Sequence, residues 1–181
     1  SYSVTGVQTC ALPIYGIKVR ENLGENYQTV YPIDWEKPEN NHFAIAEEVT
    51  IKGNRVKRPD IVLYVNGIAL GVIELKRSIV SVSEGIRQNI GNQKEAFIKT
   101  FFGTIQLVIA GNDTEGLRYG TIETPEEHYL SWKEIGNENE NRLDKNILQF
   151  CEKKRILEIA HDFIVFDSGI KKHAVIINIS E

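Results

Sequence analysis

Residues 58–76 read RPDIVLYVNGIALGVIELK, two apolar runs on either side of an Asn-Gly pair at 66–67. Both runs are rich in β-branched residues, and the pair tolerates the positive φ angles of a tight turn, so the stretch predicts a β-hairpin. The charged residues of its two strands, Asp60, Glu74 and Lys76, all stand at the end away from the turn. Because the rest of the hairpin is apolar, the role of these three charged side chains needs an explanation.

The register of the hairpin decides whether these charges meet. Glu74 and Lys76 are two residues apart on one strand, so their side chains leave the same face of the sheet. An ideal two-residue loop sets Asp60 opposite Ile73, which places it on the face away from Glu74. A three-residue connection, or a single bulge near Gly71, would shift the register by one residue and bring Asp60 onto the same face as Glu74. We expect one of the two.

If Asp60 lies on the same face as Glu74 and Lys76, two carboxylates and an ammonium share one pocket. Two bare carboxylates ~4 Å apart repel by roughly 4 kcal/mol at an effective dielectric of 20. Lys76 offsets part of this repulsion, a divalent cation offsets more, and carboxylate oxygens suit Mg²⁺. A Mg²⁺ held by Asp60 and Glu74 beside Lys76 is equipped to polarise a phosphodiester and to activate a water.

Basic residues crowd around this end of the hairpin in a chain of net charge −4. They are Lys52, Arg55, Lys57, Arg58, Lys76 and Arg77. One interpretation is a rim that contacts DNA phosphates, with Lys57, Arg58 and Arg77 as DNA-binding residues. The other is that the cations screen the acids and keep an edge strand soluble. The residues alone leave both open.

The remaining pattern predicts an α/β domain with a mixed central sheet flanked by helices. Strands are expected over 43–51, 61–65, 68–73 and 105–110, and helices from Ser83 through Phe97, from Thr124, and over 142–163. The 181 residues suffice for one domain with a core. No run is long and apolar enough to cross a bilayer. Two cysteines, Cys10 and Cys151, fit a reducing cytosol better than a disulfide framework.

The hairpin charges resemble the PD-(D/E)xK nuclease motif. A longer set of segments is similar to the N-terminal nuclease region of the restriction (R) subunit of type I restriction–modification enzymes. These segments are NNHFAIAEEV, RPDIVLYVNGIALGVIELKRS, EGIRQN, GNDTEGLRYGTIETPEE and FIVFDSGIKK, which together span most of residues 31–172. The resemblance implies a restriction-endonuclease-like fold and DNA cleavage with Mg²⁺.

The resemblance also implies roles for individual residues. Asp60 and Glu74 match the metal-binding acids and Lys76 matches the catalytic lysine. Gln88 stands where the family shows a glutamine that steadies the site, whereas Asn92 replaces the tyrosine that accompanies it. The implied partners are double-stranded DNA and the modification and specificity subunits of a restriction complex. ATP would serve a motor elsewhere in such subunits, since no P-loop occurs here.

The chain is expected to divide into three parts. Residues 15–172 are the expected nuclease domain. Residues 1–14 carry no charge, and VTGVQTCALPI resembles a translated sequencing adapter, so we interpret them as an assembly artefact; the alternative is a genuine edge strand. Residues 173–181 are interpreted as a frameshifted tail, against the alternative of a short strand, for which VIINI has the propensity.

Two further functions stay open at this stage. A degenerate nuclease fold could dock DNA or partner subunits without catalysis. A repair or mobile-element nuclease of the same broad superfamily is the third candidate, and the resemblance over residues 77–123 argues against it. Metal binding through Asp60 and Glu74 is expected of the Mg²⁺-dependent endonuclease and not of the docking module.

Overall fold

The computed structural model describes residues 12–20, 22, 24–133, 142–167 and 171–174. Most of the predicted leader and the predicted tail beyond 174 lie outside these residues. The described end of the leader belongs to α1 (Leu12–Tyr15), where Ile14 is buried and the Pro13 carbonyl accepts a hydrogen bond from the Trp35 indole at 3.1 Å. The origin of the leader stays a prediction.

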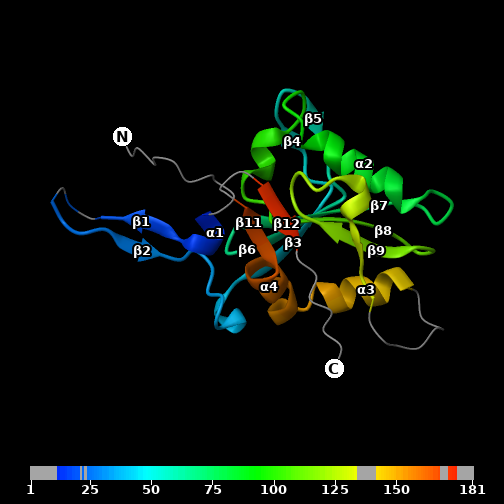
Figure 1. Cartoon of the computed structure of the whole chain (residues 1–181). Coiled ribbons are helices and arrows are strands. Elements are labelled where there is room, and N and C mark those ends of the chain that lie inside the picture. Colours follow the sequence, from blue (N-terminus) through cyan, green and yellow to red (C-terminus); the bar gives the residue numbers. More distant parts are fainter. Residues whose placement is uncertain (1–11, 21, 23, 134–141, 168–170, 175–181) are drawn as a thin grey trace.

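A mixed sheet of six strands forms the centre of the domain, in the order β10-β9-β8-β7-β6-β3 (Figure 1). Its strands are β3 (Phe43–Glu47), β6 (Ile61–Val65), β7 (Ile68–Leu75), β8 (Leu107–Asn112), β9 (Gly116–Gly120) and β10 (Leu130–Ser131). β7 and β8 are parallel, and the other neighbours are antiparallel. The predicted α/β class with a mixed sheet is confirmed.

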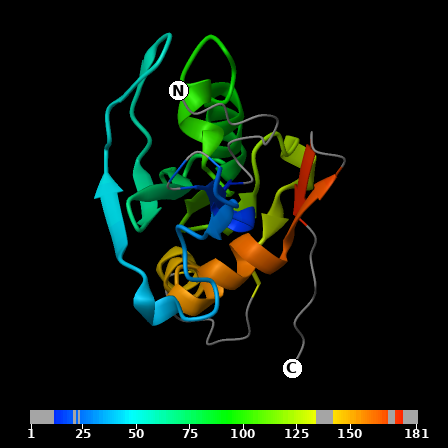
Figure 2. The ribbon, with the colours of Figure 1, turned by 90° about the vertical axis from the view of Figure 1, so that its left-hand side faces the viewer.

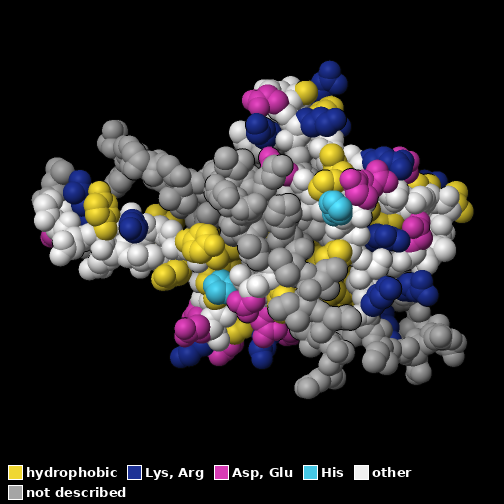
Figure 3. Space-filling model, in the orientation of Figure 1, with side chains coloured by type: hydrophobic (Ala, Val, Ile, Leu, Met, Phe, Trp, Pro, Cys, Tyr) yellow, Lys and Arg dark blue, Asp and Glu magenta, His cyan; other side chains and the backbone are white. Residues whose placement is uncertain are grey.

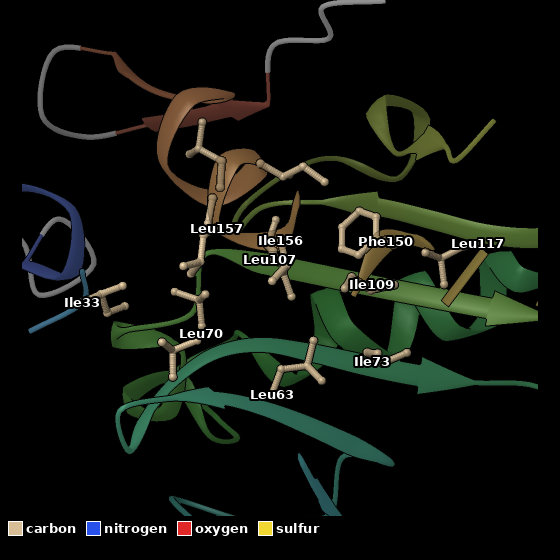
Figure 4. Close-up of a cluster of buried hydrophobic side chains, with 14 of the residues drawn as sticks. Ile33, Leu63, Leu70, Ile73, Leu107, Ile109, Leu117, Phe150, Ile156 and Leu157 are labelled. Carbon is tan, nitrogen blue, oxygen red and sulfur yellow. The ribbon is translucent and has the colours of Figure 1, made fainter. Parts of the chain in front are cut away.

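Helices cover both faces of this sheet, as the two views show (Figures 1 and 2). α2 (Val82–Asn92) makes the crossover between β7 and β8 and packs on one face with Val72, Val108 and Ala110. α3 (Arg142–Phe150) and α4 (Lys153–Asp162) pack on the other face. There the larger apolar cluster gathers around Leu70, Ile73, Leu107, Ile109, Phe150 and Leu157 (Figure 4). The sheet is therefore the middle of three layers.

Shorter elements surround these layers. Two-stranded pairs form between β1 (Ile17–Val19) and β2 (Gln28–Val30), β4 (Ile51–Lys52) and β5 (Val56–Lys57), and β11 (Ile164–Asp167) and β12 (Lys171–Ala174). Single 3₁₀ turns are η2 (Pro38–Asn40), η3 (Lys99–Gly103) and η4 (Glu126–His128). The β1–β2 ribbon projects from the body of the domain (Figure 1). No described helix has the length and apolar character of a bilayer span.

Two predicted boundaries near the hairpin are wrong. The strand expected over 43–51 ends at Glu47, because Glu48 has a φ of 49° and turns the chain out of the sheet. The helix expected from Ser83 is capped by Ser81, whose hydroxyl accepts from the Ser83 amide at 3.3 Å. This helix ends at Asn92 rather than continuing to Phe97.

Two predicted helices in the second half also differ from the structure. The helix expected from Thr124 is only the 3₁₀ turn η4, because the chain re-enters the sheet as β10 directly afterwards. The helix expected over 142–163 is divided into α3 and α4. Its break lies at Glu152, whose carboxylate accepts from the Arg155 amide at 2.8 Å and thus caps α4.

Candidate functional site

The β6–β7 hairpin combines a two-residue turn with a bulge. Val65 pairs with Ile68 across the turn, but the register shifts further along, so that Leu70 is left as the extra residue. Beyond this bulge Ile61 pairs with Ile73, which sets the preceding Asp60 beside Glu74 on the same face of the sheet. The predicted bulge near Gly71 is confirmed. This one extra residue decides that the two acids meet.

Hydrogen bonds hold the charged end of the hairpin together. Asp60 Oδ2 accepts from the Leu75 amide at 2.7 Å, which ties the start of β6 to the end of β7. Lys76 Nζ lies 3.0 Å from Glu74 Oε1. The Glu74 side chain is only 2% exposed, whereas the Lys76 side chain is 19% exposed. The structure therefore brings Asp60, Glu74 and Lys76 into one cluster, which we call the pocket, and the lysine is the more exposed member of its ion pair.

Helix α2 supplies a fourth side chain to this pocket. Gln88 accepts from Lys76 Nζ at 2.8 Å through Oε1 and donates to Glu74 Oε1 through Nε2. The close approach of the helix depends on Gly85, one turn earlier. A Cβ at Gly85 would stand 3.1 Å from the Ala110 Cβ and 3.5 Å from the Lys76 Cγ. The glutamine thus fixes the lysine and the glutamate relative to each other.

The electrostatics of the pocket centre on Glu74. Burial raises the pKa of this carboxyl, the hydrogen bond from Lys76 lowers it, and the charge of Asp60 raises it again. Its second oxygen, Oε2, is buried and has no hydrogen-bond partner among the described residues. Two carboxylates beside one ammonium leave a net negative charge here, and one buried carboxylate oxygen has no partner to offset its desolvation. The donor set therefore fits a bound cation.

Asp60 and Glu74 offer two carboxylates as possible metal ligands. Within the described ranges, no group of three or more His, Cys, Asp or Glu side chains gathers to hold a metal. Mg²⁺ is usually held by one or two carboxylates and completes its octahedral shell with waters and substrate phosphates. Asp60 and Glu74 are therefore the residues that could hold such an ion.

The loop after Lys76 is fastened to the next strand. The Asn112 side chain donates to the Val80 carbonyl at 2.7 Å, and the Thr114 hydroxyl donates to the Ser78 carbonyl at 3.1 Å. Glu115 accepts from the Val82 amide at 2.9 Å, and this hydrogen bond lowers the pKa of the Glu115 carboxyl. Asn112 was missed by sequence reasoning, because its contact spans 32 residues and leaves no local pattern.

The predicted DNA-binding residues lie around the pocket rather than in it. Arg77 is exposed at the start of this loop. Arg58 is exposed and pairs with Glu48 at 3.4 Å. Lys57 stands 4.4 Å over the ring of Phe97.

Three other titratable side chains lie in structural surroundings outside the pocket. Glu47 pairs with Ile61 in the sheet and is exposed on the face away from Glu74. His161 stacks on Trp35 at 5.0 Å between ring centroids. Burial raises the pKa of the Cys151 thiol to about 11, so this thiol is not poised as a nucleophile.

The three-layer fold and the pocket together define a restriction-endonuclease-like α/β domain. Comparison with known proteins then identifies the family. Residues 4–127 match the family described as "Type I restriction enzyme R protein N terminus", and the chain belongs to this family.

Curated relatives are named as endonuclease subunits of type I restriction enzymes. The chain is 24% identical over 148 residues to the type I restriction enzyme EcoprrI endonuclease subunit of Escherichia coli, covering 78% of the chain and 47% of that protein. It is 30% identical over 146 residues to the putative type I restriction enzyme MjaVIIIP endonuclease subunit of Methanocaldococcus jannaschii, covering 79% of the chain and 14% of that protein. The chain thus spans less than half the length of these relatives.

Proposed function

We propose that this chain is the Mg²⁺-dependent DNA endonuclease domain of a type I restriction enzyme R subunit. The observation that carries the proposal is the pocket at the bulged hairpin end. There a buried Glu74, with one unpartnered oxygen, meets Asp60 and Lys76. The reaction is hydrolysis of a phosphodiester in double-stranded DNA.

Each side chain has a chemical role in this reaction. Asp60 and Glu74 would hold the Mg²⁺, which when bound polarises the phosphodiester and lowers the pKa of an attacking water. The ammonium of Lys76 lies in the pocket beside Glu74 and stabilises the negative charge that builds on the phosphate in the transition state. Gln88 aims this ammonium by accepting a hydrogen bond from it.

The buried glutamate and Gln88 also limit the freedom of Lys76. A lysine side chain loses up to about 2 kcal/mol of rotamer entropy when it is fixed. Because two hydrogen bonds already order the ammonium, less of this entropy is lost when DNA arrives. We therefore assign Gln88 a positioning role.

The setting of the domain is proposed by analogy with the relatives. They are named as endonuclease subunits and are longer than this chain. We propose that an ATP-driven motor elsewhere in such a subunit delivers the DNA, and that the modification and specificity subunits are partners. Cleavage by this chain alone should be weak or absent, because the net-acidic chain has little affinity of its own for DNA. A cytoplasmic location is part of the proposal.

Calorimetric titration of Mg²⁺ and Mn²⁺ tests the proposal. The wild-type chain should bind one divalent cation, and Asp60→Ala should lose this binding. Glu39→Ala removes an exposed carboxylate on η2 and serves as the matched control with wild-type binding. Equal binding by the wild-type chain and Asp60→Ala would contradict the proposal and favour a noncatalytic docking module.

A further inference from the structure

A short basic hairpin precedes the candidate site. β4 and β5 pair Ile51 with Lys57 and Lys52 with Val56, and Asp60 follows three positions after Lys57. We refer to residues 51–58 as the basic hairpin. β4 and β5 lie beside α2 at the top of the molecule in Figure 1, where Figure 3 shows several blue Lys and Arg side chains.

The turn of the basic hairpin is fastened to the segment that follows α2. The Asn54 amide donates to the Phe97 carbonyl at 2.9 Å, and the Asn54 side chain donates to the Glu95 carbonyl at 2.7 Å. Gly53 allows this approach, because a Cβ there would stand 2.4 Å from the Phe97 carbonyl oxygen. The hairpin is therefore held against the domain.

Phe97 orders two cations of the basic hairpin without neutralising them. Lys57 Nζ lies 4.4 Å from the centre of the Phe97 ring, and Arg55 Cζ lies 5.5 Å from it. An aromatic ring attracts a cation through its quadrupole and leaves the net positive charge in place, unlike a carboxylate. Among the residues that the structure describes, no ion pair involves Lys52, Arg55 or Lys57.

Several other cations of the domain face acids instead. Arg87 pairs with Glu84 and Glu126, Lys99 with Glu95, and Lys154 with Glu158. Within the basic hairpin Arg58 pairs with Glu48, whereas Lys52, Arg55 and Lys57 concentrate positive charge without an ion-pair partner among the described residues, in a chain whose net charge is −4. Such a local concentration attracts a polyanion that the surface as a whole repels.

We propose that the basic hairpin, ordered by Phe97, is the surface on which the phosphate backbone of duplex DNA lies at the site. This inference rests on the proposed function and extends it. Asp60 lies three positions after Lys57, a span of at most about 10 Å. Phosphates follow one another every ~3.4 Å along the axis on each DNA strand. A strand seated at Asp60 therefore places further phosphates beside the hairpin cations.

Binding of a short duplex by fluorescence anisotropy, in EDTA and over a range of low salt concentrations, tests this surface. The double variant Arg55→Gln/Lys57→Gln should bind more weakly, with a slope of log K against log salt that is smaller by about 1.8, or ~0.9 per cation. Phe97→Leu keeps every charge and should weaken binding about two- to fivefold, with little change of slope. Thermal melts of each variant confirm that it is folded.

A matched control comes from the opposite face of the domain. Lys153 on α4 lies 5.5 Å from the ring of Phe43, the same arrangement of a lysine and a phenylalanine away from the candidate site. Lys153→Gln should bind DNA as the wild-type chain does. Wild-type affinity and slope in the Arg55/Lys57 double variant, an equal loss in Lys153→Gln, or no measurable binding by the wild-type chain would each overturn the inference.

The assay separates this inference from the proposed function. DNA binding in EDTA does not depend on a metal at Asp60 and Glu74, whereas the calorimetric titration does. The hairpin variants should keep wild-type Mg²⁺ binding, because none of the substituted residues lies in the pocket. Failure of the metal titration with success of the DNA assay would leave a DNA-docking surface without catalysis.

Discussion

The substitution Glu74→Gln separates the structural cost of the buried carboxylate from its proposed role in metal binding. Glutamine keeps the shape of the side chain and replaces the unpartnered Oε2 with an amide donor. It therefore removes one of two neighbouring negative charges and offers a hydrogen bond where none exists. In the absence of metal, we expect the variant to be more stable than the wild-type chain.

The magnitude follows from two opposing contributions. Two carboxylates about 4 Å apart repel by ~4 kcal/mol at an effective dielectric of 20. The variant weakens the charge-assisted hydrogen bond with Lys76, which contributes about 1.5–3 kcal/mol. The difference is a gain of about 1–2.5 kcal/mol in the free energy of unfolding, or a rise of about 2–10 °C in Tm for a domain of this size.

The gain in stability of Glu74→Gln over the wild-type chain should increase as pH rises. The folded-state pKa of Glu74 is raised above its ordinary value of 4.5, so the folded chain holds this proton more tightly than the unfolded chain. Below pH 4.5 the carboxyl is protonated in both states and carries no charge penalty. As pH rises through the raised pKa, the wild-type chain loses stability that the variant keeps. The advantage of Glu74→Gln should therefore appear only above this range.

Thermal unfolding followed by circular dichroism measures both effects. In EDTA at neutral pH, Glu74→Gln should melt above the wild-type chain, while Glu39→Gln, an exposed control, should melt with it. Added Mg²⁺ at 100 times its Kd should stabilise the wild-type chain by ~2.7 kcal/mol and leave the variant unchanged. A variant that melts below the wild-type chain in EDTA would refute the reasoning, because the carboxylate would then be satisfied without a cation.

Three further substitutions test contacts around the pocket. Gln88→Leu leaves the buried ion pair without its amide and should cost about 1–3 kcal/mol in chemical denaturation; unchanged stability together with unchanged calorimetric Mg²⁺ affinity would contradict the positioning role. Gly53→Ala drives a Cβ into the Phe97 carbonyl and should lower stability by about 1–3 kcal/mol, and a neutral effect in the same assay would show that the hairpin is not fastened there. The hydrogen bond from the Val82 amide lowers the pKa of Glu115, so its contribution is present above its ordinary pKa of 4.5 and is lost as pH falls through the lowered value. Glu115→Gln should thus be less stable than the wild-type chain at pH 7 and equal to it in strong acid, and a difference that persists in acid would count against this assignment.

Local chemistry was enough to predict the central part of the site. The Asn-Gly turn and the alternation of β6 and β7 defined the hairpin, and the need for Asp60 to meet Glu74 required a bulge, which the structure shows at Leu70. Boundaries were harder. Ser81 and Ser83 are both good helix caps, so the sequence did not distinguish them.

Contacts between distant segments were beyond sequence reasoning. The Asn54 side chain bonds a carbonyl 41 residues further along the chain, and Asn112 reaches back 32 residues. Neither contact has a local periodicity or motif. The cations of the basic hairpin were evident in the sequence, but the ring of Phe97 that orders them was not, because folding alone brings it to the hairpin.

The position of a bound divalent cation tests the central claim most directly. Crystals of the chain soaked in Mn²⁺ would locate the ion by its anomalous scattering. One peak should lie within coordination distance of both the Asp60 and Glu74 carboxylates, with Lys76 alongside, and should be absent from crystals of Glu74→Gln. A wild-type crystal without a peak at these carboxylates, or with the same peak in the variant, would contradict the account.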